Sequence, residues 1–286
     1  MSPTFDMVDM KGKVVIVTGG KHWLWDRPPS RLMKLKTESL ESGNMDIVWL
    51  KLDLSDPRLA RQSAEDFLQQ EKRLDVLVNN AGLMLEPYEA GPDGMSKLVI
   101  VNYLSPFVFT QTLLPLLIST SQELNSDVAS ISHKWTRGFK CDTVQDLNVS
   151  YDKRWFSSFW RYAHSKLLVI LWTKSLQKRL DASEPPVPIT VISLHPGSVD
   201  TFTHKWSLAP LWKLLITPVV TDIERGSYTS FFAAAGKDIR DNRNKYKGIY
   251  LEDNPPRITN PSKVARDDDL AQRLWTITVG FFSELS

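Results

Sequence analysis

Cysteine is almost absent from the chain, and this absence limits how the protein can be held together. Cys141 is the single cysteine among 286 residues, so no internal disulfide can form. A chain without a disulfide framework fits a reducing compartment, and we expect a cytoplasmic protein. His133, His164 and His204 have no metal-ligand spacing from cysteine or carboxylates, so we predict no metal site and interpret them as structural or surface residues.

The sequence also lacks long apolar runs and charge of one sign. The stretch YLSPFVFTQTLLPLLI is interrupted by Ser, Pro, Thr and Gln, so no continuous apolar run is long enough to span a bilayer. The start, MSPTFDMVDM, shows no signal pattern. Net charge is only +2 with Lys and Arg spread along the chain, which argues against nucleic-acid binding. We expect a soluble protein, and the sequence is compatible with peripheral membrane contact and with a homodimer.

What the chain does contain is an alternation of strand-like and helix-like segments. Short β-branched runs ended by glycine or polar residues are typical of buried parallel strands. Strands are expected at 13–19, 46–56, 74–82, 127–132, 188–197 and 248–251, and helices at 58–73, 95–118 and 160–180. This alternation predicts an α/β fold with a Rossmann-like, doubly wound parallel sheet, in a single domain over 1–286.

Polar residues follow most of the predicted strands. They are Thr18-Gly19-Gly20, Asp53, Asn79 to Gly82, Ser130 with Ser132, and His195-Pro196-Gly197. In parallel α/β sheets the carboxyl ends of the strands line one edge, where ligands bind. The sequence therefore predicts a single binding site at that edge.

The segment YAHSK places Tyr162 and Lys166 on one face of a predicted helix. An ammonium beside a phenol favours the phenolate, which lowers the tyrosine pKa and allows proton exchange near neutral pH. Both residues are common, so an isolated pair would be interpreted as surface residues. Here the pair lies between a strand ending in serine and one ending in HPG, which favours a catalytic role.

At this point the chain resembles the short-chain dehydrogenase/reductase family over nearly its whole length. The segments VIVTGG, LDLSD, LDVLVNNAG, VNYLSPFVFTQTLLPLL, YAHSK and ISLHPGSVDT match that family in order. HKW, DLN, SK and KRL make the chain most similar to the retinol-dehydrogenase-like branch and its fungal relatives. The resemblance implies carbonyl–alcohol interconversion with NADP(H), or with NAD(H).

The resemblance also implies a role for each matching residue. Tyr162 is the general acid/base, Lys166 lowers its pKa and binds the nicotinamide ribose, and Asn102 anchors a proton-relay water. The implied cofactor contacts further include the loop residues Thr18, Gly19, Gly20 and Leu24; Asp53 at the adenine; Asn80, Ala81 and Gly82 at the ribose and central strand; and Pro196, Val199 and Thr201 at the nicotinamide carboxamide.

A serine after the fifth strand should orient the substrate oxygen, and its position is ambiguous here. The chain reads SISHKW where the family has two serines and a gap before the histidine. Ser132 is the candidate, whereas His133 takes that place if the strand is aligned without a gap. Ser130 would lie deeper in the sheet.

Plainer interpretations of several residues stay open. Asn102 could bond its own helix backbone, and Asp53 could cap the following turn. Residues 79–82 could be only a strand-ending turn, and 195–197 a plain loop.

The phosphate-binding loop departs from the family pattern T-G-x-x-x-G-x-G. Trp23 and Trp25 occupy the two later glycine positions, where indole rings should collide with the dinucleotide. Between Gly20 and Ile47 the chain is also too short for helix, strand and helix. We therefore expect a shortened or disrupted first βαβ unit.

A frame slip or misplaced intron boundary would explain this loop. Each Trp codon is TGG, and reading one base later turns it into GGN, which always encodes glycine. The shifted frame can read Asn-Thr-Gly-Phe-Gly-Ile and restore both glycines. The alternative function is thus a catalytically inactive relative, or the product of a faulty gene model, with impaired cofactor binding.

Residues 201–248 correspond to the substrate lid of the family. Trp206, Leu208, Leu211, Trp212, Leu214 and Leu215 form its apolar positions. They indicate an apolar pocket or a membrane-touching helix, or else ordinary core packing. We expect a lipophilic small-molecule substrate, in secondary metabolism.

Overall fold

The described part of the chain folds around one sheet of six strands. The computed structural model describes residues 5–19, 48, 50–120, 124–128, 133, 134, 136, 138–196, 223–252 and 255–284. The strands are β1 (Val15–Val17), β2 (Val76–Asn79), β3 (Leu124–Val128), β4 (Thr190–Leu194), β5 (Tyr250–Glu252) and β6 (Arg257–Thr259). They pair in this numerical order, β1 to β5 in parallel and β6 antiparallel to β5.

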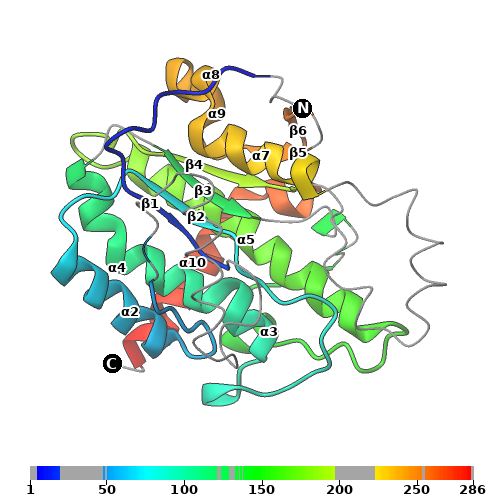
Figure 1. Cartoon of the computed structure of the whole chain (residues 1–286). Helices are drawn as coiled ribbons and strands as arrows, with labels where there is room; N and C mark the ends of the chain where they lie inside the picture. Colours follow the sequence, from blue (N-terminus) through cyan, green and yellow to red (C-terminus); the bar gives the residue numbers. More distant parts are fainter. Residues whose placement is uncertain are drawn as a thin grey trace.

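Helices cover both faces of the sheet (Figure 1). One face carries α2 (Pro57–Gln70), α4 (Ser105–Thr120), α5 (Ser157–Asp181) and α10 (Asp268–Glu284). The other face carries α7 (Ile223–Ala235), α8 (Lys237–Asp241) and α9 (Arg243–Tyr246). The connecting elements are the 3₁₀ turns Pro92–Gly94, Val144–Leu147 and Val264–Arg266, the short helix α3 (Lys97–Val99) and a π-helical turn, η3 (Ile100–Leu104).

The predicted α/β fold with a Rossmann-like sheet is confirmed, and the three predicted helices occur as α2, α3 to α4, and α5. Five predicted strands occur as β1, β2, β3, β4 and β5. β3 overlaps the strand predicted at 127–132 at residues 127 and 128, and residues 129–132 lie outside the described residues. The antiparallel strand β6 was missed, because three residues after two prolines give too short a pattern to recognise.

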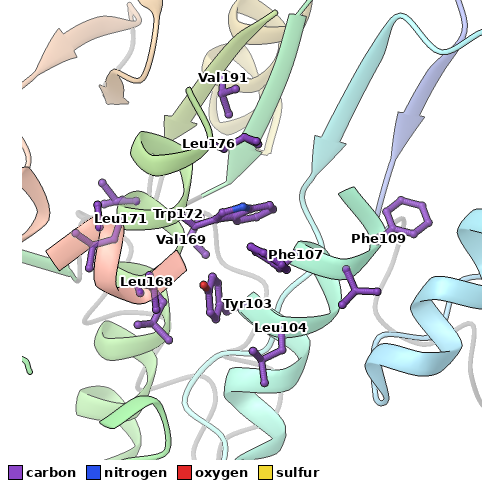
Figure 2. Packing of buried hydrophobic residues seen from close by; sticks show 14 of the residues in the cluster. Tyr103, Leu104, Phe107, Phe109, Leu168, Val169, Leu171, Trp172, Leu176 and Val191 are labelled. Carbon is purple, nitrogen blue, oxygen red and sulfur yellow. The ribbon is translucent and has the colours of Figure 1, made fainter. Parts of the chain in front are cut away.

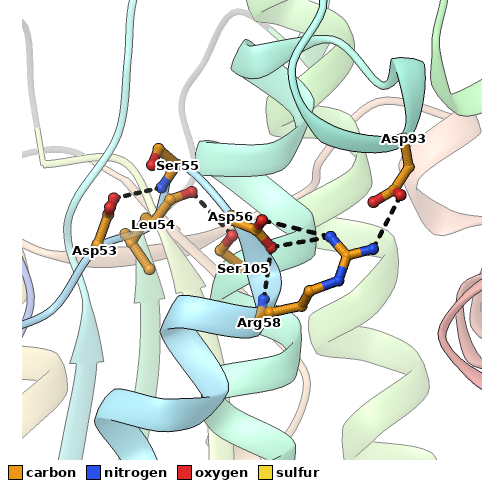
Figure 3. A network of polar contacts seen from close by, with 7 residues as sticks. All are labelled: Asp53, Leu54, Ser55, Asp56, Arg58, Asp93 and Ser105. Carbon is orange, nitrogen blue, oxygen red and sulfur yellow. Dashed lines mark hydrogen bonds and ion pairs between the residues drawn. The ribbon is translucent and has the colours of Figure 1, made fainter. Parts of the chain in front are cut away.

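The strand predicted at 46–56 is wrong for its described residues, which are 48 and 50–56. The segment WLKLDL alternates as a strand would, but its described backbone groups bond elsewhere. Ser55 N donates to Asp53 Oδ1 at 2.8 Å, and the Leu54 carbonyl accepts from the Ser105 hydroxyl of α4 at 2.9 Å (Figure 3). These bonds hold an irregular segment that leads into α2, where Asp56 caps the helix and Pro57 occupies its first turn.

β1 lies at one end of the described strand order. Val17 is 58% exposed, although the sequence predicts a buried parallel strand. No described strand pairs with the outer edge of β1. Residues 20–47, where a disrupted first βαβ unit is expected, lie outside the described residues, so that expectation stays a prediction.

The main core fixes α5, the helix that carries Tyr162 and Lys166, between the sheet and neighbouring helices. Figure 2 shows Tyr103, Phe107 and Trp172 packed together from two helical segments. Their ring centroids are 5.7 Å apart for Phe107–Trp172 and 6.1 Å for Tyr103–Trp172. Because α10 packs on the far side, α5 is buried along most of its length and offers a rigid support for the site.

One described helix, Lys97–Thr120, is long and apolar enough to cross a membrane by length and composition. Its best window is 72% buried inside the protein, with a mean hydropathy of 1.3. Burial of this kind is typical of a core helix, so the helix is weak evidence for a membrane span.

Candidate active site

The turns after β1 and β2 are locked together by hydrogen bonds. The Thr18 hydroxyl accepts from Ala81 N at 3.0 Å, and Asn80 Nδ2 donates to the Thr18 carbonyl at 3.0 Å. Gly19 has φ +86°, and a Cβ there would lie 2.6 Å from Ala81 Cα. Only glycine fits at this position. The Asn80-Ala81 turn therefore does more than end its strand: it fixes the first loop.

Asn102 lies in the π-helical turn η3 and bonds to two other parts of the chain. Its Nδ2 donates to the Leu83 carbonyl and to Ser165 Oγ, both at 2.9 Å, and its Oδ1 accepts from Leu83 N at 2.7 Å. None of these bonds goes to its own helix backbone, so the plainer interpretation of Asn102 is wrong. A single π-helical turn inside a helix is frequent at functional sites.

Ser165 lies within the segment YAHSK, and the sequence alone indicates no role for it. Its hydroxyl is fully buried, accepts from Asn102 Nδ2 and donates to the Tyr162 carbonyl at 2.8 Å. Ser165 thus connects η3 to the turn of α5 that lies between Tyr162 and Lys166. The available signal was a serine placed directly before the lysine.

The structure brings Lys166 and Tyr162 together with Asn102 and Gly82. Lys166 Nζ lies 5.8 Å from the centroid of the half-buried Tyr162 ring. An added Cβ at Gly82 would lie 3.2 Å from that Nζ and 3.1 Å from Asn102 Oδ1. Burial lowers the pKa of Lys166 to about 8, since a desolvated ammonium is disfavoured. The arrangement places one buried amine beside a phenol ring, which suits proton exchange on an oxygen substrate.

Asp53 follows the irregular segment before α2 and is buried. Its Oδ1 accepts from Ser55 N, as the capping interpretation expects (Figure 3). Its Oδ2 is buried and has no hydrogen-bond partner among the described residues. The same figure shows Arg58 joined to Asp56 and Asp93, with 2.9 Å to Asp93, which anchors this segment against the turn before α3. Asp53 therefore keeps one acceptor oxygen for a further donor.

The described histidines of interest are buried structural residues, as the sequence predicted. His133 is fully buried; its Nε2 accepts from Ser262 N at 3.2 Å, and its ring packs on Tyr250 with centroids 4.9 Å apart. This side chain contacts the segment that follows β6, whereas Ser132 lies outside the described residues, so the choice between Ser132 and His133 stays a prediction. His164 Nδ1 shares a 2.9 Å hydrogen bond with the Tyr151 hydroxyl, and burial lowers the pKa of His164 to about 4.

Arg161 is a further buried residue that sequence reasoning missed. It precedes Tyr162 on α5 and donates to the Ser150 carbonyl at 2.7 Å and to the Glu86 carbonyl at 3.1 Å. These two carbonyls belong to the loops before α5 and after β2. Arg161 thus ties both loops to the helix beside the site, and no local motif signals such a contact.

The remaining expected site residues either follow β4 or lie outside the described residues. Pro196 lies half-buried after β4, where His195 N donates to the Leu251 carbonyl at 2.8 Å. The expected residues outside the described part are Gly20, Leu24, Ser130, Ser132, Val199, Thr201 and His204. Among the described residues, no group of three or more His, Cys, Asp or Glu side chains could hold a metal ion.

Comparison with known proteins identifies the family of the chain. The sequence model of the short chain dehydrogenase family matches residues 12–132. A short-chain dehydrogenase/reductase from Armillaria gallica is 36% identical over 262 residues, covering 87% of this chain and 79% of that protein. Human retinol dehydrogenase 12 is 30% identical over 291 residues, covering 95% of this chain and 86% of its own.

Solved structures of short-chain dehydrogenases share the fold of this chain. A short-chain dehydrogenase/reductase structure from Serratia marcescens aligns with a TM-score of 0.56 at 22% identity, covering 79% of this chain and 82% of that one. The resemblance inferred from the sequence is therefore confirmed, both for the family and for its retinol-dehydrogenase-like and fungal members. The chain belongs to the short-chain dehydrogenase/reductase family of NAD(P)-linked oxidoreductases, which act on small molecules.

Proposed function

We propose that the protein uses NADP(H), with NAD(H) as the alternative, to interconvert a carbonyl and an alcohol on a lipophilic small molecule. The observation that carries the proposal is the cluster of Tyr162, Lys166 and Asn102 around Gly82. Similarity to human retinol dehydrogenase 12 supports the lipophilic substrate, and we include secondary metabolism because of the fungal relatives. The buried free thiol of Cys141 supports a reducing, cytoplasmic compartment as part of the same proposal.

In this proposal Tyr162 exchanges the proton at the substrate oxygen. Its phenol gives the proton when a carbonyl is reduced and takes it back when an alcohol is oxidised. The buried ammonium of Lys166 stabilises the negative charge on the phenolic oxygen, and its low-dielectric setting strengthens that effect. Asn102 holds η3 in place through Leu83 and anchors the water that relays the proton.

The described residues fit a dinucleotide at its two ends. The buried Oδ2 of Asp53 lacks a described partner and suits the adenine amino group. Glycine at position 82 lets the backbone pass close to Lys166 Nζ, which we assign to the ribose hydroxyls, since a side chain there would crowd it. Asn80, Ala81 and Pro196 complete the described contacts that we assign, and the bound cofactor supplies the hydride chemistry.

The proposal also extends to residues outside the described part of the chain. Ser132 orients the substrate oxygen, and Gly20, Leu24, Val199 and Thr201 complete the cofactor contacts. Residues 201–248 form the substrate lid of a single domain over 1–286; within this range α7, α8 and α9 lie on the face of the sheet opposite α5 (Figure 1).

Titration of the purified, folded chain with NADPH and NADH tests the proposal. We expect saturable binding of NADPH, weaker binding of NADH, and weakening of both by Asp53→Ala. Trp23 and Trp25 in the phosphate-binding loop favour one rival, an inactive relative. If a protein with an intact circular dichroism spectrum binds neither dinucleotide, the inactive relative is the correct interpretation.

A further inference from the structure

The loop before α5 presents two aromatic side chains to solvent. Trp155 is 95% exposed and Phe156 is 53% exposed. An exposed tryptophan leaves a large apolar surface in contact with water, and contiguous apolar patches of this kind often mark interaction sites. We propose that this aromatic loop, residues 151–156, docks the protein on an anionic lipid surface.

The loop is held in its outward shape by contacts of its own. Trp160 Nε1 donates to the Trp155 carbonyl at 3.2 Å, and the Phe156 ring stacks on Phe159 with centroids 5.9 Å apart. The Arg154 guanidinium lies 4.6 Å above the Trp160 ring. These contacts pin the backbone of Trp155 while its indole points away, so the exposure is built into the loop.

The backbone at both ends of the loop is in a conformation that favours glycine. Tyr151 has φ +59° and Phe156 has φ +60°. Such a conformation is strained for a residue with a side chain, and outliers of this kind gather at ligand clamps and other functional segments. Two strained aromatic residues therefore bracket the exposed tryptophan, as expected of a loop whose shape has a function.

The charges of the loop indicate which surface it meets. Lys153 and Arg154 are both exposed beside Trp155, while Asp152 is the single acidic residue of the loop. Tryptophan prefers the boundary between lipid and water, and adjacent cations are attracted to anionic headgroups. The six residues of the loop are also far fewer than the roughly 20–30 residues that each partner contributes to a stable protein interface. A lipid surface therefore fits better than a second copy of the chain.

The position of the loop would place the membrane near the site. The aromatic loop leads directly into α5, and Tyr162 lies in the second turn of that helix. Arg161 ties the backbone of Ser150, next to the loop, to the same helix. Docking at Trp155 would thus bring the lipid surface to the end of α5 that carries the active-site residues.

Vesicle co-sedimentation of the full chain tests this inference without any substrate or cofactor. The probes are phosphatidylcholine vesicles with and without phosphatidylserine. We expect the wild type to bind the anionic vesicles and to lose binding as salt rises. Trp155→Ala should lower the partition coefficient by about tenfold, because the indole no longer enters the interface. Lys153→Gln should lower binding to anionic vesicles by about fivefold and leave binding to neutral vesicles unchanged.

Phe231→Ala provides the matched control, since Phe231 is 55% exposed but lies on α7, on the opposite face of the sheet. It should bind vesicles as the wild type does. Absence of wild-type binding, or equal binding by Trp155→Ala, would overturn the inference. So would a concentration-dependent dimer, seen by sedimentation velocity without lipid, that Trp155→Ala abolishes. Phe156→Gly, which relieves the backbone, serves as a second variant if Trp155→Ala has lost its circular dichroism spectrum.

Discussion

Asn102 Nδ2 donates a 2.9 Å hydrogen bond to the hydroxyl of Ser165, and both side chains are buried. The bond joins η3 to α5, and the Ser165 hydroxyl in turn donates to the Tyr162 carbonyl. Two segments far apart in the chain are thereby fixed with respect to each other at the residues that we propose to act on the substrate. The site is rigid because of polar contacts inside the core as well as apolar packing.

Ser165→Ala should reduce both stability and turnover. The change leaves the buried Nδ2 of Asn102 with a single acceptor, the Leu83 carbonyl, so the free energy of unfolding should fall by about 1–2 kcal/mol. We expect kcat to fall more than KM rises, because the geometry of Tyr162 is altered and substrate contacts are not. Urea unfolding and steady-state kinetics measure the two effects.

Ser175→Ala is the control for this change. Ser175 lies on the same helix and is buried, but its hydroxyl has no hydrogen-bond partner among the described residues. Its removal should leave stability within about 0.5 kcal/mol of the wild type. Equal losses in the two variants would contradict the role assigned to Ser165.

Gly82→Ala should weaken cofactor use with little effect on the fold. The new methyl group would lie 3.2 Å from Lys166 Nζ, so the ammonium must move away from its place near the ring of Tyr162. We expect kcat/KM to fall by about tenfold or more. Gly280→Ala on α10, where an added Cβ meets nothing within 4 Å, should instead raise stability by about 0.5–1 kcal/mol. A Gly82→Ala enzyme with wild-type kinetics would refute the close approach.

Acid should destabilise the protein through His164. Burial lowers the pKa of His164 to about 4 in the folded protein, against an ordinary histidine value of 6.5, so the unfolded chain binds more protons between these pH values. Stability is fully present above the higher pKa and falls as pH drops through the window toward the lower one. From neutral pH to about pH 4 the loss should reach ~3 kcal/mol.

Urea unfolding of the wild type and of His164→Asn across this pH range checks the point. Asparagine can keep a hydrogen bond to the Tyr151 hydroxyl without titrating. The difference in unfolding free energy between the two proteins should therefore shrink or reverse as the pH falls. A difference that is constant with pH would show that His164 does not titrate on unfolding.

Much of the site could be read from the sequence because it depends on local motifs. Tyr162 and Lys166 share a helix face because they are four residues apart. Asn80 to Gly82 follow a short apolar run whose sequence predicts a buried strand. The strand order then brings Thr18 beside Ala81 through parallel pairing of β1 and β2. These relationships require only the fold and the period of each element.

Other parts could not be read because they depend on contacts between distant residues. Ser165 meets Asn102 across 63 positions and Arg161 meets Glu86 across 75, and neither pair has a local signature. The prediction of a strand at 46–56 is wrong for its described residues, because alternation of apolar and polar residues does not determine whether the backbone pairs with another strand. In the structure the backbone near Asp53 and Leu54 bonds to a turn and to α4 rather than to a neighbouring strand.

The most direct test of the proposed chemistry is the NADPH-dependent reduction of a panel of apolar aldehydes and ketones by the wild type and by Tyr162→Phe. The account predicts measurable turnover by the wild type. It also predicts that Tyr162→Phe keeps its fold and cofactor binding but loses at least about 100-fold in kcat, because the proton at the substrate oxygen has no donor. Full activity in Tyr162→Phe would contradict the account.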